Sequence, residues 1–282
     1  MNLLSLFSFA IFAAESVLSP LPLNFVPPTP PPQKPAVSFS QLPIILSPTP
    51  TLPPAPSPTP SLFPTPTPRT TKKQSVTIAL LGDSMMDTLG PDAPYITQTL
   101  KTIYPTTTFD VQNFGVGGTP IEFGIERVST VALSNPDVVV LESYAYNVSG
   151  TTNQTGVDNH WLALARAVDA IKQTIPDAKI VIAATIAPNR ERFGDGAPGL
   201  SFSLEDKIVR TNMIKKYLET TIQFAQGEHI PLADSYHASL DSTGNGKRAL
   251  ISFSDHIHYS DAGRKLFSQK IAQSIVANKL LE

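Results

Sequence analysis

From about residue 75 onward, short apolar runs alternate with longer segments in which apolar residues recur every three or four positions. The short runs are rich in Val and Ile and are bounded by turn-forming residues, which is typical of buried strands. The longer segments have the spacing of amphipathic helices. We therefore expect strands at 76–81, 109–113, 138–141, 179–184 and 230–234, and helices at 159–175, 204–224 and 261–280.

The alternation of strand and helix determines the expected fold class. Strands that are each followed by a helix form a parallel sheet with helices on both faces. The sequence thus predicts an α/β protein with a three-layer α/β/α, flavodoxin-like fold around a central five-stranded parallel sheet. In such sheets, ligands bind in the crevice at the carboxyl ends of the strands.

Residues 1–74 have a different composition. The apolar stretch 3–14 is too short for a bilayer span but has the length of a signal-peptide apolar region. Most of the 28 prolines follow it, and proline lacks the N–H that helices and sheets require. We expect a signal-like or anchor segment at 1–19, a disordered Pro/Thr/Ser-rich linker at 20–74 and a folded domain at 75–282. This organisation predicts a cell-surface or secreted protein, with the N-terminal segment as a possible membrane or cell-wall tether.

Charge and cysteine content exclude several kinds of chemistry. The formal net charge is -2 and the sequence has no strongly basic block, so nucleic acid is not an expected partner. The chain has no cysteine, which excludes disulfides and cysteine-based metal or redox chemistry. We expect no cofactor and a monomeric protein.

A serine lies where the first expected strand ends. Gly82, Asp83 and Ser84 follow the apolar run 76–81, so the Ser84 hydroxyl is expected at the carboxyl edge of the sheet. An isolated Asp-Ser pair is most often a helix N-cap. As a nucleophile, serine would need a base, a group that orients the base, and donors for an oxyanion.

An Asp-x-x-His sequence near the C-terminus supplies a base and its orienting group. Asp255 and His258 are about one turn apart, so the carboxylate can hold one ring nitrogen while the other faces Ser84. His256 lies between them and is expected to point away. These residues could also suggest a metal site, but no further ligands follow at a recognisable spacing, so we expect no metal.

The combination of these segments resembles the SGNH (GDSL-type) serine hydrolases. The resemblance rests on Gly-Asp-Ser at 82–84, Asn-x-Gly-x-Gly-Gly at 113–118, an asparagine after the third strand and Asp-x-x-His at 255–258. It covers about residues 75–282. It implies that Ser84, Asp255 and His258 form a catalytic triad, and that the Ser84 N–H, the Gly118 N–H and the Asn147 amide form the oxyanion hole. Gly115 or Gly117 could replace Gly118 if the loop were shifted.

The segment after the third strand departs from the family pattern. The family usually has Gly-x-Asn-Asp here, whereas this chain has Ser143-Tyr144-Ala145-Tyr146-Asn147, with neither that glycine nor the aspartate. Asn147 is the only asparagine in this loop. Tyr144 and Tyr146 are candidates to line the substrate pocket. Glu142, at the end of the strand, could support either this loop or the histidine.

The function expected from this resemblance is an exported serine esterase. It would hydrolyse O-acyl esters, in particular O-acetyl groups on cell-surface carbohydrate, through an acyl-enzyme intermediate. The partner would then be an acylated small molecule or polysaccharide. An acyltransferase, or a lysophospholipase or short-chain lipase, would use the same residues. A glycan-binding module without catalysis is the alternative of another class.

Overall fold

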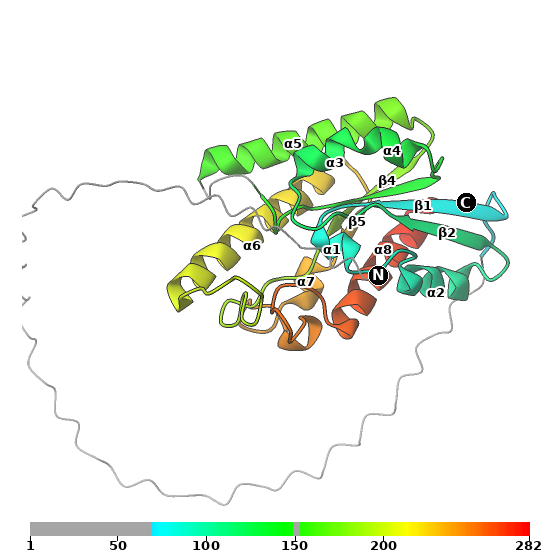
Figure 1. Cartoon of the computed structure of the whole chain (residues 1–282). Helices are drawn as coiled ribbons and strands as arrows, with labels where there is room; N and C mark the ends of the chain where they lie inside the picture. The colour runs from blue at the N-terminus through cyan, green and yellow to red at the C-terminus, as the bar shows by residue number, and fades with distance from the viewer. Residues whose placement is uncertain (1–68, 149–152) are drawn as a thin grey trace, which may run out of the picture. The chain divides into compact units, whose positions relative to one another are not determined.

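A computed structural model describes residues 69–148 and 153–282 of the chain. The segment expected at 1–19 and nearly all of the expected linker lie outside the described residues. The structure confirms the expected α/β class, because five strands form one all-parallel sheet in the order β2-β1-β3-β4-β5 (Figure 1). The strands are β1 (Ser75–Leu81), β2 (Thr108–Asn113), β3 (Val138–Glu142), β4 (Lys179–Ala184) and β5 (Leu232–Asp234).

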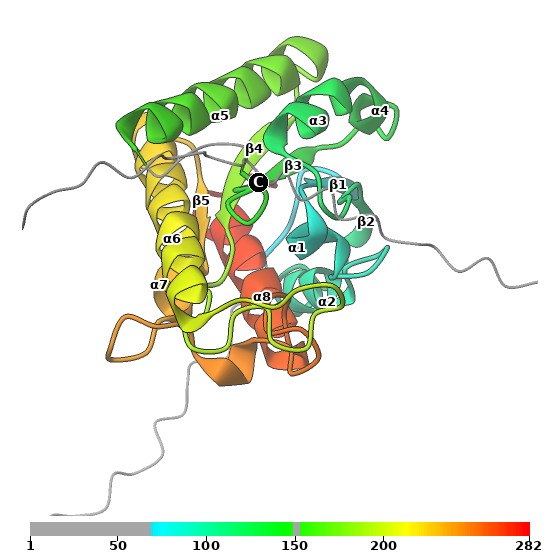
Figure 2. The ribbon, with the colours of Figure 1, turned by 60° about the vertical axis from the view of Figure 1, so that its left-hand side comes forward.

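Helices connect the strands and cover both faces of the sheet. α2 and α8 lie on one face, whereas α3, α4 and α5 lie on the other, with α6 beside α5 (Figures 1 and 2). The helices are α1 (Ser84–Asp87), α2 (Pro94–Ile103), α3 (Ile121–Glu126), α4 (Val128–Ala132), α5 (Gln154–Thr174), α6 (Leu204–Gly227), α7 (Tyr236–Ser239) and α8 (Asp261–Ala277).

The apolar strands are buried on both faces because successive side chains point to opposite sides. Ile78 and Leu80 of β1 pack into the cluster that includes α2 and α8. Ala79 and Leu81, which alternate with them, pack into the cluster that includes α3, α4 and α5. Trp161 of α5 joins this second cluster, where its ring meets that of Phe224 edge-on. The uninterrupted apolar runs in the sequence follow from this double burial.

Capping residues fix where the long helices begin. The Asn153 side chain accepts a hydrogen bond from the Gly156 N–H and starts α5. Ser203 and Asp206 form a capping box at the start of α6. β5 is shorter than expected because Pro231 has no N–H to donate, although its carbonyl accepts the Ile182 N–H.

The two ends of the described unit meet at the amino ends of the strands. The backbone N–H of Arg69 donates to the Ile103 carbonyl (2.7 Å), and that of Lys72 donates to the Leu281 carbonyl (2.9 Å). The Arg69 guanidinium also pairs with Glu282 at 2.8 Å. Contacts with the folded unit therefore begin before β1. Among the described residues, no helix has the length and apolar character needed to cross a bilayer.

Candidate active site

Ser84 begins the short helix α1, directly after the turn that ends β1. The Asp83 side chain caps this helix by accepting the Met85 N–H at 2.8 Å. A Cβ atom at Gly82 would lie 2.7 Å from the Cβ atoms of both Glu142 and Met86, so only glycine fits this turn. The Ser84 side chain is partly exposed, and its backbone N–H has no hydrogen-bond partner in the described part of the chain. This N–H is therefore available to an oxyanion.

Asp255 and His258 form a hydrogen-bonded pair in the loop before α8. Asp255 Oδ2 lies 2.8 Å from His258 Nδ1, and Oδ1 accepts the backbone N–H groups of Ile257 and His258. Burial raises the pKa of Asp255, but these hydrogen bonds outweigh it and lower the pKa to about 2. An ionised Asp255 keeps the proton on Nδ1 and leaves the Nε2 lone pair free to accept one.

The neighbouring His256 has a different partner. Its Nδ1 lies 2.7 Å from the carbonyl oxygen of Asp195, in the loop between β4 and α6. Gly196 approaches the same turn closely, since a Cβ there would lie 2.5 Å from the Ser254 carbonyl oxygen. His256 thus links that loop to the turn carrying Asp255. Within the described ranges, no group of three or more His, Cys, Asp or Glu side chains could hold a metal ion.

The glycine-rich loop after β2 lies against the Ser84 turn. Val116 donates its N–H to the Gly82 carbonyl at 3.0 Å. Gly115 packs so tightly that a Cβ would lie 2.4 Å from the Asp87 nitrogen, and its N–H is bonded to Asn113. Gly115 is therefore occupied in holding the loop. Gly118 has a φ of 72° and an N–H without a partner among the described residues, as an oxyanion donor requires.

Asn147 extends toward the Ser84 turn from the end of β3. Its Nδ2 donates to Asp83 Oδ2 at 2.8 Å. An amide nitrogen carries two hydrogens, so this bond fixes which end of the amide faces the turn and leaves the second N–H free. The loop thus brings Asn147 to the turn that carries Ser84, without the glycine and aspartate of the family pattern.

Two carboxyl groups are fully buried beneath the site. Burial raises the pKa of Asp83, while hydrogen bonds from Met85 and Asn147 and the charge of His258 oppose this rise. Burial and the nearby Asp83 charge raise the pKa of Glu142 well above its usual range. The Ser143 hydroxyl and the Tyr144 N–H are the close hydrogen-bond partners of Glu142.

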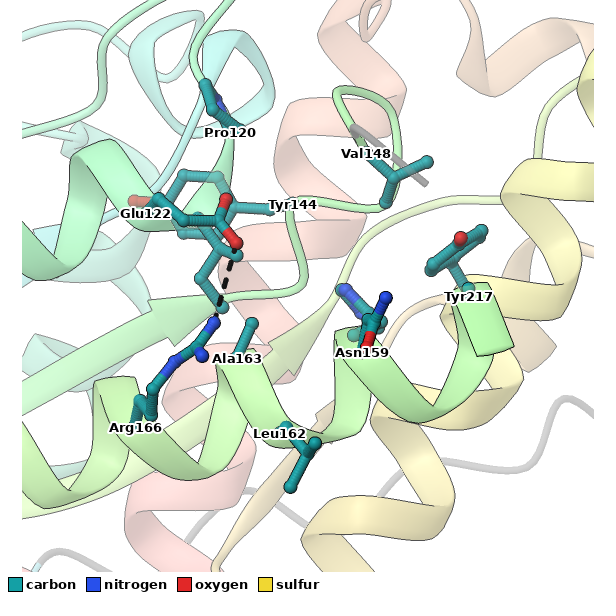
Figure 3. Close-up of a pocket in the computed structure, with 12 residues that line it drawn as sticks. Pro120, Glu122, Tyr144, Val148, Asn159, Leu162, Ala163, Arg166 and Tyr217 are labelled. Atoms are coloured by element: carbon teal, nitrogen blue, oxygen red, sulfur yellow. Dashed lines mark ion pairs between the residues drawn. The ribbon is translucent and has the colours of Figure 1, made fainter. Parts of the chain in front are cut away.

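The structure separates the two tyrosines expected in the substrate pocket. Tyr144 and Val148 line a cavity of about 260 Å³, which lies between α3, α5, α6 and the loop after β3 (Figure 3). The Tyr144 hydroxyl is buried beside Gly124, where a Cβ would lie 2.1 Å away. Tyr146 does not line this cavity, and its hydroxyl donates instead to the Ile186 carbonyl at 3.1 Å.

The same cavity has polar residues that sequence reasoning missed. Arg166 of α5 and Glu122 of α3 form an ion pair of 3.7 Å at one end, and Asn159 lies toward the other (Figure 3). His160 also lines the cavity, and burial lowers its pKa to about 4. No sequence motif singles these residues out, because they come from two helices, α3 and α5, whose packing the sequence does not give.

All the candidate groups lie at the carboxyl edge of one parallel sheet. Ser84, Gly118 and Asn147 follow β1, β2 and β3, and His258 precedes Tyr259, whose hydroxyl bonds to Thr185 after β4. A nucleophile, an oriented imidazole and free N–H donors at one edge of an α/β/α sheet define the serine hydrolase class.

Comparison with known proteins identifies the family. The model of the GDSL-like Lipase/Acylhydrolase family matches residues 80–266. The chain belongs to this family and is a serine ester hydrolase. Among curated proteins, no sequence matches it significantly.

Solved structures share the fold at low sequence identity. A putative GDSL-like lipase from Parabacteroides merdae is 17% identical with a TM-score of 0.56, over 76% of this chain and all (100%) of that one. The lipase/acylhydrolase from Enterococcus faecalis is 19% identical with a TM-score of 0.53, over 72% of this chain and 96% of that one. A catalytic mutant of the acetylxylan esterase Axe2 from Geobacillus stearothermophilus is 16% identical with a TM-score of 0.51, over 71% of this chain and 94% of that one.

Proposed function

We propose that this hydrolase removes O-acyl groups, in particular O-acetyl groups, from carbohydrate at the cell surface. The observation that carries the proposal is the Asp255–His258 pair of 2.8 Å at the sheet edge that also bears Ser84. One structural neighbour is an acetylxylan esterase, which supports an acetyl group on a sugar as the substrate.

The reaction proceeds in two steps. His258 Nε2 takes the Ser84 proton as Oγ attacks the ester carbonyl, and Asp255 stabilises the resulting imidazolium. The oxyanion accepts hydrogen bonds from the Ser84 N–H, the Gly118 N–H and the free N–H of Asn147. His258 then protonates the leaving alcohol. Water, deprotonated by His258, attacks the acyl-Ser84 ester, and His258 returns the proton to Ser84 Oγ as the acid leaves.

Composition supports a location outside the cell. The apolar stretch 3–14 has the length of a signal-peptide region, and the proline-rich segment that follows suits a spacer between a surface and a folded domain. We place the enzyme at the cell surface or in the medium on this basis. Fractionation of the producing cells tests this placement, and recovery in the cytosol alone would contradict it.

A fluorophosphonate probe tests the nucleophile. The full chain, Ser84→Ala and His258→Ala are each treated with the probe and followed by intact mass. We expect one adduct on the unaltered protein and none on either variant. An unlabelled, folded protein would contradict an activated serine and favour a binding module.

Substrate class is then tested by product release. We expect acetate from acetylated xylan and from p-nitrophenyl acetate, with poor activity on long-chain acyl esters. Faster cleavage of lysophospholipid, or acyl transfer to an added sugar in preference to water, would replace the esterase proposal with one of its alternatives.

A further inference from the structure

Glu142 is a buried acid without a basic partner. It ends β3, is fully buried, and appears in none of the ion pairs found among the described residues. An unpaired buried carboxyl costs several kcal/mol if it is charged, so its presence calls for a compensating role. The contacts of Glu142 identify that role.

Glu142 takes part in a closed ring of contacts around the active-site loop. Its Oε2 accepts the Tyr144 N–H at 2.9 Å, and the Tyr144 carbonyl accepts the Asn147 N–H at 3.1 Å. Asn147 Nδ2 donates to Asp83 Oδ2 at 2.8 Å, and the Asp83 N–H lies 3.5 Å from Glu142 Oε2. The ring joins the end of β3 to the turn that carries Ser84.

The loop needs such support at its first turn. Tyr144 has a φ of 52°, a left-handed conformation that is unfavourable for a bulky residue. Such a conformation persists only where its surroundings fix it. Here Glu142 holds the Tyr144 N–H, and the Tyr144 ring is fixed against Gly124. A glycine would adopt this conformation freely, and the family pattern has one in this loop.

We propose that Glu142 is a positioning residue that holds the loop 143–147 so that the Asn147 amide can donate to the oxyanion. This inference rests on the proposed esterase function. Of the two roles open to Glu142 from the sequence, its contacts favour support of the loop, because they go to Ser143, Tyr144 and Asp83.

The protonated form of Glu142 suits this role. Burial and the adjacent Asp83 charge raise the pKa of Glu142 well above its usual range. The Ser143 hydroxyl donates to Oε1 at 2.6 Å and the Tyr144 N–H donates to Oε2 at 2.9 Å, and a neutral carboxyl keeps both contacts without burying a charge. Asp83 Oδ2 accepts the Asn147 amide at 2.8 Å.

Kinetics of four proteins test the coupling between Glu142 and Asn147. These are the full chain, Glu142→Ala, Asn147→Ala and the double variant, assayed on p-nitrophenyl acetate. Loss of an oxyanion donor lowers kcat by about 100-fold or more. We expect this for Asn147→Ala, and a loss of about tenfold or more for Glu142→Ala, each with little change in KM. In the double variant, we expect no further loss beyond that of Asn147→Ala, because residues that act through one another are not additive.

Two further variants separate positioning from a general loss of stability. Glu142→Gln keeps an acceptor for the Tyr144 N–H and an amide that can hydrogen-bond with the Ser143 hydroxyl, which both donates and accepts, so we expect kcat within about threefold of the unaltered chain. Val139→Ala removes buried volume from the same strand without touching the ring. We expect it to lower the melting temperature but leave kcat within about twofold.

Each outcome has a defined consequence. If the kcat losses of Glu142→Ala and Asn147→Ala multiply in the double variant, the inference is overturned. It is also overturned if Val139→Ala lowers kcat as much as Glu142→Ala does when the two variants have the same melting temperature. If the unaltered chain is active and Glu142→Ala is equally active, the inference is overturned but the proposed function stands. A folded chain that neither hydrolyses the ester nor reacts with the probe at Ser84 would overturn the proposed function, and this inference with it.

Discussion

Asp255 uses both carboxylate oxygens within its own turn, one for the His258 ring and one for two backbone N–H groups. The carboxylate therefore shapes the turn as well as orienting the His258 ring, the proposed base. This explains why its pKa falls to about 2 despite burial. Because these hydrogen bonds form only in the folded chain, they also contribute to the stability of the fold.

The pKa of Asp255 predicts a pH-dependent contribution to folding. Because the folded pKa is about 2 and that of an unfolded Asp is about 3.9, stabilisation is present above pH 4 and is lost as pH falls toward 2. We expect the difference in unfolding free energy between the unaltered chain and Asp255→Asn to shrink by about 1 kcal/mol from pH 5 to pH 3. Urea titrations at both pH values measure it. A difference that stays constant would contradict the assigned hydrogen bonds.

Asn159 tests whether the cavity that Tyr144 lines holds the sugar of the proposed substrate, since none of the residues assigned to the reaction lines that cavity. Its side chain lies at the wall formed by α5, next to apolar groups, which suits the mixed surface of a sugar ring. We expect Asn159→Ala to raise KM about fivefold or more for an acetylated oligosaccharide, because the loss of one hydrogen bond costs about 1 kcal/mol. KM for p-nitrophenyl acetate should not change. Equal effects on both substrates would exclude the cavity as the sugar site.

At the level of elements, the sequence patterns were sufficient for the sheet and the long helices. The doubly buried strands and the 3–4 residue spacing of α5, α6 and α8 are strong signals. The helices α1, α3, α4 and α7 have between four and six residues, too few for a periodic pattern. β3 includes Glu142, a residue that composition alone would place outside a buried strand.

The active-site residues could be proposed from local motifs, but their contacts could not. Asp255 and His258 lie three positions apart, so their hydrogen bond follows from local geometry. The bond between Asn147 and Asp83 spans 64 positions and depends on β1 and β3 being neighbours in the sheet. The ring of contacts around Glu142 also depends on β1 and β3 being neighbours in the sheet, so the sequence alone could not predict it.

The glycine-rich loop and α1 are predicted to be mutually dependent. Gly115→Ala would place a Cβ 2.4 Å from the Asp87 nitrogen, a backbone atom that cannot yield easily. We expect a loss of about 2–4 kcal/mol in unfolding free energy, together with reduced probe labelling of Ser84. Gly244→Ala is the control, because the new Cβ has open space around it and the cost comes from the positive φ of Gly244 (72°), which Gly115 does not share. We expect it to cost about 1 kcal/mol without affecting labelling.

For the whole molecule, the described unit carries every group assigned to the reaction. A chain that starts at Arg69 keeps the hydrogen bonds to Ile103 and Leu281. We expect it to hydrolyse p-nitrophenyl acetate with the kcat of the full chain. A chain that starts at Ser75 loses those bonds and should melt at a lower temperature. A large loss of kcat in the 69–282 chain would show that the first 68 residues take part in catalysis.

Arg69 and Glu282 meet at the amino ends of the strands, whereas Ser84 lies at the carboxyl ends. A short peptide could therefore join the two ends, and new termini could be opened in a surface loop to give a circular permutant. For the same reason, either end could be immobilised on a bead without blocking the catalytic edge.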